Sequence, residues 1–222
     1  MLKTNNFGLM LIAAIALGAK LASATIIAPG TPNAPVNGEW KPIGGTVIAG
    51  GTTVPIISLN YPDFGFTGTL TTSVISGDIT NPYGGLTFTY LITNDAGSIS
   101  DIDRITINGF AGVLTDISYD LSSSGIDPSG LSRSSGFGTT VGFVFHSPPV
   151  SPDTASALLV IQTNVLQYYN NVFQVIDGDI AQGMTYAATP LGSGNPLPEP
   201  TTLAVAGMGI TSLLIRRRRK WA

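Results

Sequence analysis

Two stretches decide the fold class of this 222-residue chain: Phe64-Gly65-Phe66-Thr67-Gly68-Thr69-Leu70-Thr71 and Leu86-Thr87-Phe88-Thr89-Tyr90. In both, large apolar residues alternate with small or polar ones. Because successive side chains of an extended strand point to opposite faces, a period of two indicates strands with one buried face. The two stretches therefore predict β-structure.

The same pattern recurs along much of the chain, separated by Pro- and Gly-containing segments that favour turns. A competing helical stripe occurs only in residues 154–170, where β-branched side chains favour a strand instead. About ten short strands at this spacing predict an all-β fold, an antiparallel β-sandwich of jelly-roll-like type. The further predicted strands are 46–49, 54–59, 105–107, 117–121, 141–145, 157–163, 172–176 and 184–187.

Two long segments are expected to be loops. Residues 25–51 are rich in Pro and Gly and predict a poorly ordered N-terminal arm. Residues 122–138, SSSGIDPSGLSRSSGFG, predict a mobile surface loop because Ser and Gly dominate them. The β-sandwich domain is accordingly expected over residues 52–192.

The start of the chain has the three parts of a signal peptide. Lys3 supplies a positive charge, and an apolar run follows at residues 7–19. Ala22 and Ala24 then form the small-residue pattern of a cleavage site, so the mature chain is expected to begin at Thr25. The alternative is an uncleaved anchor, but about 13 apolar residues are too few for a comfortable span.

The end of the chain has the parts of a short membrane anchor. A Pro-rich linker at residues 193–200 precedes an apolar segment at residues 201–215. About 15 residues span roughly 22 Å as a helix, compared with roughly 30 Å of hydrocarbon in a bilayer, so flanking cations must reach the headgroups. A basic block supplies them and favours a cytoplasmic end. These cations are Arg216, Arg217, Arg218, Arg219 and Lys220.

The linker also carries a Pro-Glu-Pro motif, formed by Pro198, Glu199 and Pro200. This motif, followed by a short apolar helix and an arginine block at the chain end, resembles a PEP-CTERM sorting signal over about residues 196–220. Lys220-Trp221-Ala222 after the arginines is a minor departure. The body is similar, more loosely, to bodies that accompany such tails. The segments that carry this similarity are 81–88, 115–119, 159–164 and 175–178.

The resemblance implies a route for the protein. Proteins of this family are exported, held in the inner membrane by the tail, and processed by exosortase, a membrane transpeptidase-like enzyme. Known members come from Gram-negative bacteria that make extracellular polysaccharide and biofilm. Exosortase, the export machinery and the inner membrane are therefore implied partners, with extracellular polysaccharide as a further one. The implied final location is the cell surface or the extracellular space.

The section between Thr25 and Pro200 is strongly acidic. It contains three cations, Lys41, Arg104 and Arg133, and all 13 acidic residues, which gives a formal charge of −10 compared with −3 for the whole chain. Such a field repels nucleic acid and anionic membrane surfaces, so neither is expected as a partner of the body. The chain has no Cys, which excludes disulfides, thiolate zinc sites and a Cys nucleophile.

Two D-x-D pairs are the candidate metal ligands: Asp101 with Asp103, and Asp177 with Asp179. Side chains two residues apart share one face of an extended chain, and carboxylates are ligands that Ca²⁺ prefers. Neither pair continues into an EF-hand loop, and turn-capping hydrogen bonds are the alternative. Ca²⁺ is the one cofactor that the sequence brings into consideration.

Catalytic constellations are not found in the sequence. His146 is the sole histidine, and the chain has no G-x-S-x-G nucleophile elbow. Glu39 beside Trp40 is weak support for sugar stacking. We therefore expect no enzyme. Three functions stay open: a structural or adhesive protein of the cell surface or biofilm matrix, a Ca²⁺-dependent or carbohydrate-binding module, and, least favoured, a secreted glycan-acting enzyme that uses aspartates.

Overall fold

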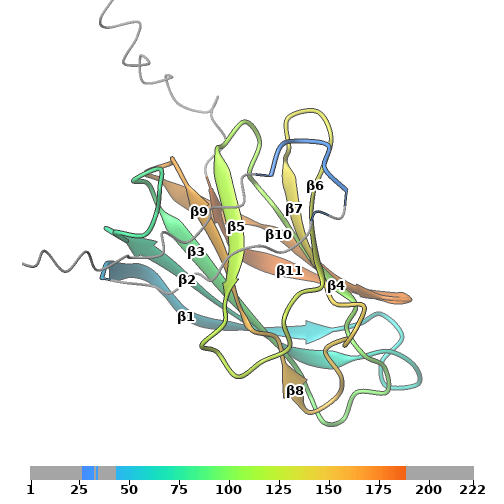
Figure 1. The fold of residues 1–222 in the computed structure, drawn as a ribbon. Coiled ribbons are helices and arrows are strands. Elements are labelled where there is room, and N and C mark those ends of the chain that lie inside the picture. Colours follow the sequence, from blue (N-terminus) through green and yellow to red (C-terminus); the bar gives the residue numbers. More distant parts are fainter. Residues whose placement is uncertain (1–26, 33, 35–43, 189–222) are drawn as a thin grey trace, which may run out of the picture.

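The computed structural model describes residues 27–32, 34 and 44–188, and this part of the chain is all-β (Figure 1). It contains eleven strands in two antiparallel sheets and no helix, which confirms the prediction of an all-β, antiparallel fold. The strands are β1 (Thr46–Ile57), β2 (Thr67–Ser76), β3 (Thr87–Asn94), β4 (Arg104–Asn108), β5 (Thr115–Asp120), β6 (Gly130–Arg133), β7 (Thr140–Val144), β8 (Thr154–Ala155), β9 (Leu158–Thr163), β10 (Tyr168–Asp177) and β11 (Asp179–Ala188).

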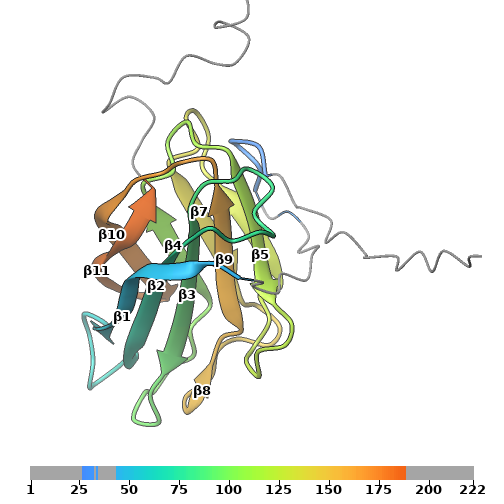
Figure 2. The ribbon, with the colours of Figure 1, turned by 90° about the vertical axis from the view of Figure 1, so that its left-hand side faces the viewer.

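The first sheet has the strand order β1-β2-β3-β9-β5, with the short β8 paired to β3, and the second has the order β11-β10-β4-β7-β6. Figure 2 shows the first sheet in front of the second. The chain changes sheet after β3, β4, β5, β7 and β9, so strands that are distant in sequence become neighbours. Pairing of β3 with β9 and of β4 with β10 is the result.

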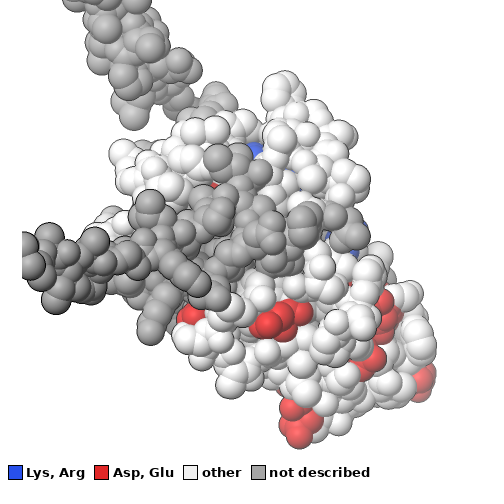
Figure 3. All heavy atoms as spheres, in the orientation of Figure 1, with Lys and Arg blue, Asp and Glu red and all other residues white. Residues whose placement is uncertain are grey.

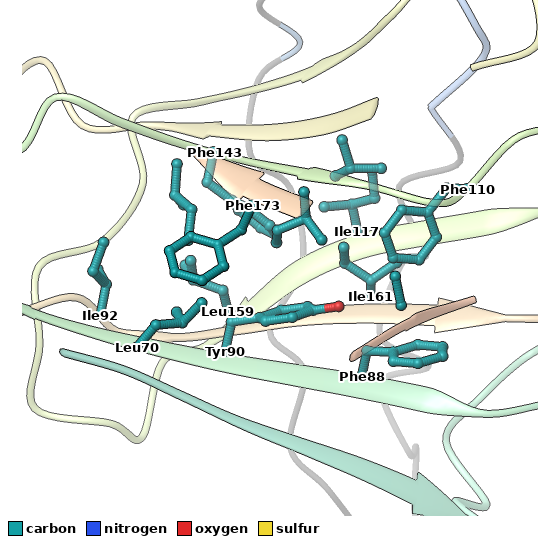
Figure 4. Packing of buried hydrophobic residues seen from close by; sticks show 14 of the residues in the cluster. Leu70, Phe88, Tyr90, Ile92, Phe110, Ile117, Phe143, Leu159, Ile161 and Phe173 are labelled. Atoms are coloured by element: carbon teal, nitrogen blue, oxygen red, sulfur yellow. The ribbon is translucent and has the colours of Figure 1, made fainter. Parts of the chain in front are cut away.

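The core fills the space between the two sheets. Alternate residues of β3 point into it: Phe88, Tyr90 and Ile92 have no exposed surface. They pack with side chains of the opposite sheet such as Phe143 and Phe173 (Figure 4). The predicted alternation of large apolar and small polar residues in this stretch is therefore the pattern of a central strand.

Two hydrogen bonds cross the core and join the sheets. The Tyr90 hydroxyl donates to the carbonyl oxygen of Tyr186 on β11, at 2.7 Å. The Thr72 hydroxyl on β2 bonds the Thr185 hydroxyl on β11, at 2.6 Å. A buried hydroxyl without a partner is costly, so these pairs fix how the sheets sit on each other.

The first strand is longer than the sequence pattern indicates. Residues 46–49 and 54–59 were predicted as separate strands, whereas β1 runs from Thr46 to Ile57 as one strand. Its pairing with β2 shifts register between Val47 and Ala49 and again between Gly50 and Thr52. These irregularities break the period of two and hide the continuity of the strand.

The expected surface loop at residues 122–138 is wrong in part, because it contains β6. Leu131 of this strand is fully buried, and Arg133 is 6% exposed. A four-residue strand among Ser and Gly is too short to show a period. Residues 154–170 form strands and no helix, as the β-branched residues indicate.

The N-terminal segment formed by residues 27–32 and 34 lies against the edge of β6. Ile27 belongs to the core, and Ala34 forms an antiparallel bridge with Leu131. The amide of Gly30 donates to the Ser134 carbonyl, and the amide of Arg133 donates to the Thr31 carbonyl. This part of the expected arm thus extends the second sheet beyond β6.

Candidate functional site

The residues predicted for cleavage and sorting lie outside the described residues, as do Glu39 and Trp40. Within the described ranges, no helix has the length and apolar character that a membrane span requires. The residues concerned are Ala22, Ala24 and Thr25 at the start, and Pro198, Glu199, Pro200, Arg216, Arg217, Arg218, Arg219 and Lys220 at the end.

Three of the four candidate metal ligands gather at one end of β10. The register that pairs Ile176 with Arg104 brings Asp177 next to Asp103, whose amide donates to the Ile176 carbonyl at 3.2 Å. Burial raises the pKa of Asp177, and the negative charges of Asp103 and Asp101 raise it further. Asp177 therefore lies in a negatively charged environment. Among the residues in view, no three His, Cys, Asp or Glu side chains converge as a metal site.

The fourth candidate, Asp179, has partners of its own. The chain reverses at Gly178, which has a φ of 59°, so the expectation that Asp177 and Asp179 share one face of an extended chain is wrong. The Asp179 carboxylate accepts hydrogen bonds from the Asn60 amide at 2.9 Å, from Asn60 Nδ2 at 3.1 Å and from the Ile180 amide at 2.9 Å. These bonds, that of the Asn60 amide foremost, lower the pKa of Asp179. Asp179 ties the 58–60 segment to the β10–β11 hairpin.

Asp78 is a further carboxylate with a full set of hydrogen bonds. It is 5% exposed. One carboxylate oxygen accepts from the Thr80 amide and hydroxyl, at 2.9 and 2.7 Å. The other accepts from the Thr87 hydroxyl at 2.8 Å and from Gln162 Nε2 at 3.1 Å. The arrangement stabilises the turn after β2 against β3 and β9.

His146 lies just past the end of β7 and is exposed. Its backbone amide donates to the Ser129 hydroxyl at 3.0 Å. Among the described residues, no side chain bonds the imidazole and orients it for acid-base chemistry.

Arg133 is a buried cation held by neutral oxygens. Its Nε donates to the Gly138 carbonyl, and its two terminal nitrogens donate to the carbonyls of Ile27, Phe110 and Val113 and to the Thr115 hydroxyl, at 2.6 to 3.1 Å. Burial lowers its pKa, an effect that the nearby Tyr83 partly offsets. One side chain thus joins the N-terminal segment, the 110–113 turn, β5 and the 134–139 loop.

Arg104 is the second cation, and it lies beside a cleft of about 260 Å³ on the outer face of the second sheet. Arg133 also lines this cleft, and Arg104 and Arg133 are the only Lys or Arg residues in the described ranges. No carboxylate is among the lining residues. Most carboxylates visible in Figure 3 lie instead over the half of the molecule that carries β8.

The guanidinium of Arg104 is sparsely bonded. Its Nη2 donates to the Ser132 hydroxyl at 2.7 Å, while its Nε is buried and has no partner in the described structure. Gly142 on β7 leaves room for it, because a Cβ there would lie 3.1 Å from Nη2 and 3.3 Å from Nε. Five hydroxyl side chains complete the polar lining, those of Thr31, Ser132, Ser134, Ser135 and Thr140.

Neither arginine was predicted as a site residue from the sequence, in which both enter only as positive charges, and the cleft was not predicted. The signal that points to it is their rarity, since an acidic body keeps only three cations. No protein-family model, no curated protein and no solved structure matches this chain.

Proposed function

We propose that this chain is an exported, non-enzymatic protein of the cell surface or extracellular matrix, sorted by exosortase through a PEP-CTERM signal at about residues 196–220. The observation that carries the proposal is the order of three features at the chain end: the Pro-Glu-Pro motif, a short apolar segment and a basic block. A signal-like start at the other end supports it.

The route follows from the chemistry of the two ends. Signal peptidase cleaves after Ala24, and the apolar segment at residues 201–215 stops in the inner membrane because the basic block resists translocation. The prolines cannot donate backbone hydrogen bonds, so the motif stays extended. It is accessible on the outer side of the inner membrane, where the anchor begins. Exosortase then processes the chain near Pro198–Pro200 and frees the body for the surface or the matrix.

The body suits a passive extracellular role. Its chain has no Cys for a disulfide, and a continuous core with hydrogen bonds across it holds the sheets together. Two of its aspartates, Asp78 and Asp179, are engaged in structural hydrogen bonds. In the finer description we propose, a jelly-roll-like body is flanked by the signal peptide and the transmembrane segment.

Replacing Pro198, Glu199 and Pro200 together by Ala tests the sorting role in the native bacterium. We expect the variant to be exported but to stay uncut in the membrane fraction. The matched control replaces Thr201 and Thr202 by Ala, which leaves the motif intact and should be processed normally. Normal processing of the triple variant would refute the proposal.

A carbohydrate-binding module is the second candidate. The observation that favours it is the cleft at Arg104, which combines a guanidinium with several hydroxyl groups. Ca²⁺ has less support, because no three carboxylates of the described residues converge as a metal site and Asp179 is bonded to Asn60 instead. A glycan-acting enzyme stays the least favoured reading.

A further inference from the structure

We propose that the cleft at Arg104 binds an anionic sugar, that is, a sugar residue that carries one acidic group, either a carboxylate or a phosphate. The proposal rests on the proposed function, because export is what brings the body into contact with extracellular glycans. It assigns a site and a ligand class that the sorting signal leaves open.

Charge is the first argument. The described part of the body is rich in aspartates, yet the cleft is lined by Arg104, whose guanidinium lies beside Ser132, and by no carboxylate. Such a cleft is a local positive potential in an otherwise negative field. A densely charged polymer would be repelled by the rest of the body, whereas a glycan with isolated acidic residues would not. The ligand is therefore expected to carry single acidic groups among neutral sugars.

The unused donors of Arg104 are the second argument. A guanidinium has five N–H donors and no acceptor capacity. Arg104 places one of them on the Ser132 hydroxyl, and its Nε is buried without a partner, so the other N–H groups of its terminal nitrogens are the donors for a ligand. Arg133 differs in that five hydrogen bonds to neutral oxygens occupy its guanidinium. Arg104 is thus the arginine available for an acidic group, whereas the guanidinium of Arg133 is held by Ile27, Phe110, Val113 and Thr115.

The rest of the lining fits the remainder of a sugar. The hydroxyls of Ser132, Ser134 and Thr140 each make a hydrogen bond to another protein group. Their oxygens keep lone pairs that can accept hydrogen bonds from sugar hydroxyls. The cleft, at about 260 Å³, lies just below the roughly 300–1,000 Å³ of pockets for drug-sized ligands. It suits a single sugar residue rather than a long glycan segment.

Gly142 is the third argument. A Cβ at this position would lie 2.5 Å from the Ser132 hydroxyl oxygen and close to two nitrogens of Arg104. The absence of a side chain therefore lets the guanidinium lie over β7 beside Ser132. Because Gly142 sits in a strand interior, where Gly weakens a sheet, its presence is explained by this close approach.

Titration calorimetry on the full chain in detergent, at low ionic strength, tests the proposal. The probes are glucuronic acid linked to glucose, glucose 6-phosphate, cellobiose and inorganic phosphate. We expect at least one of the two acidic sugars to bind at least about tenfold more tightly than cellobiose and inorganic phosphate, since hydrogen bonds to a charged group are strong. The tighter of the two acidic sugars identifies the acidic group.

Three variants locate the binding. Arg104→Gln should lower the affinity at least about tenfold, and Gly142→Ala should do the same by displacing the guanidinium without removing its charge. Ile79→Glu makes the same change in net charge as Arg104→Gln at a residue that is 76% exposed and outside the cleft lining, so its affinity should be unchanged. Should Gly142→Ala fail to fold, Arg104→Gln alone decides, because its side chain is only partly buried.

Equal binding of cellobiose, equal binding of inorganic phosphate, an affinity that Arg104→Gln leaves unchanged, or no binding of either acidic sugar would overturn the proposal. These outcomes differ from a failure of the proposed function. Arg104→Gln is expected to be exported and processed like the natural chain, so a chain that binds no sugar but is correctly cut refutes the site alone.

Discussion

At the scale of single residues, the two arginines of the described body have opposite roles. Arg133 is 6% exposed and donates to five neutral oxygens, so it holds segments together from inside. Arg104 is partly exposed and makes one hydrogen bond to Ser132. The same residue type is structural in one place and available to a ligand in the other, and burial with satisfied donors separates the two.

We expect Arg133→Met to destabilise the protein by at least about 3 kcal/mol, because it leaves several buried carbonyls without a donor and each costs roughly 1–3 kcal/mol. Urea denaturation of the purified chain measures this. Arg104→Met is the matched control and should cost under about 1 kcal/mol. Equal losses in the two variants would show that the hydrogen bonds of Arg133 are not what stabilises the fold.

Asp177 and Asp179 should respond to pH in opposite senses. The lowered pKa of Asp179 means that its charged form stabilises the fold above the ordinary pKa of an aspartate, and that this stabilisation is lost as the pH falls through the lowered value. The raised pKa of Asp177 means that its charged form opposes folding once the pH has risen through the raised value.

Thermal unfolding at pH 7 and at pH 3 tests both directions. At pH 7, Asp179→Asn should lower the melting temperature and Asp177→Asn should raise it slightly, and both differences should shrink at pH 3. A chelator should leave the natural chain unchanged at pH 7. A lower melting temperature for Asp177→Asn together with loss of stability on chelation would instead assign Ca²⁺ to the group that contains Asp101 and Asp103.

The sequence predicted the arrangement of some of these aspartates and not of others. Asp101, Asp103 and Asp177 were selected by their spacing, and the pairing of β10 with β4 does bring Asp177 next to Asp103. The separation of Asp179 depends on the turn at Gly178 and on Asn60, which is 119 positions away in the chain. Local spacing carries no information on such a long-range partner. The same holds for the cleft, whose lining comes from three separated segments.

At the scale of elements, the strands with a clear period of two were found from the sequence and the irregular ones were not. Residues 86–90 alternate cleanly and form β3, the central strand of the first sheet, and the apolar residues 141–145 supply β7, which has a neighbour on either side. β6 escaped because four residues among Ser and Gly show no period, and β1 was divided by its register shifts. Each is nevertheless an edge strand held by backbone pairing with the next strand along the chain, β1 with β2 and β6 with β7.

The hydrogen bonds between the two sheets are expected to contribute to the free energy of unfolding. Tyr90→Phe leaves the Tyr186 carbonyl without its donor from β3 and should destabilise the protein by about 1–2 kcal/mol. Tyr168→Phe is the control, because Tyr168 is 37% exposed, and it should change the free energy of unfolding by less than about 0.5 kcal/mol. Chemical denaturation measures both. An unchanged free energy of unfolding for Tyr90→Phe would show that this hydrogen bond does not stabilise the fold.

At the scale of the whole molecule, the chain consists of an acidic β-body between two ends of quite different composition. The fold class was predictable because it depends on a local period. The body carries a formal charge of −10 between residues 25 and 200, whereas the basic block lies in the last seven residues. This division favours a body that stays in water and a tail that stays at the cytoplasmic side of a membrane.

Export and processing by exosortase are tested by measuring the intact mass and the cell fraction of the protein recovered from its native bacterium. Export with processing by exosortase predicts a species that begins at about Thr25, ends near Pro200 and lies outside the inner membrane. Recovery of the chain with Arg216–Ala222 still attached, solely in the membrane fraction, would contradict the account and make the protein a tail-anchored one.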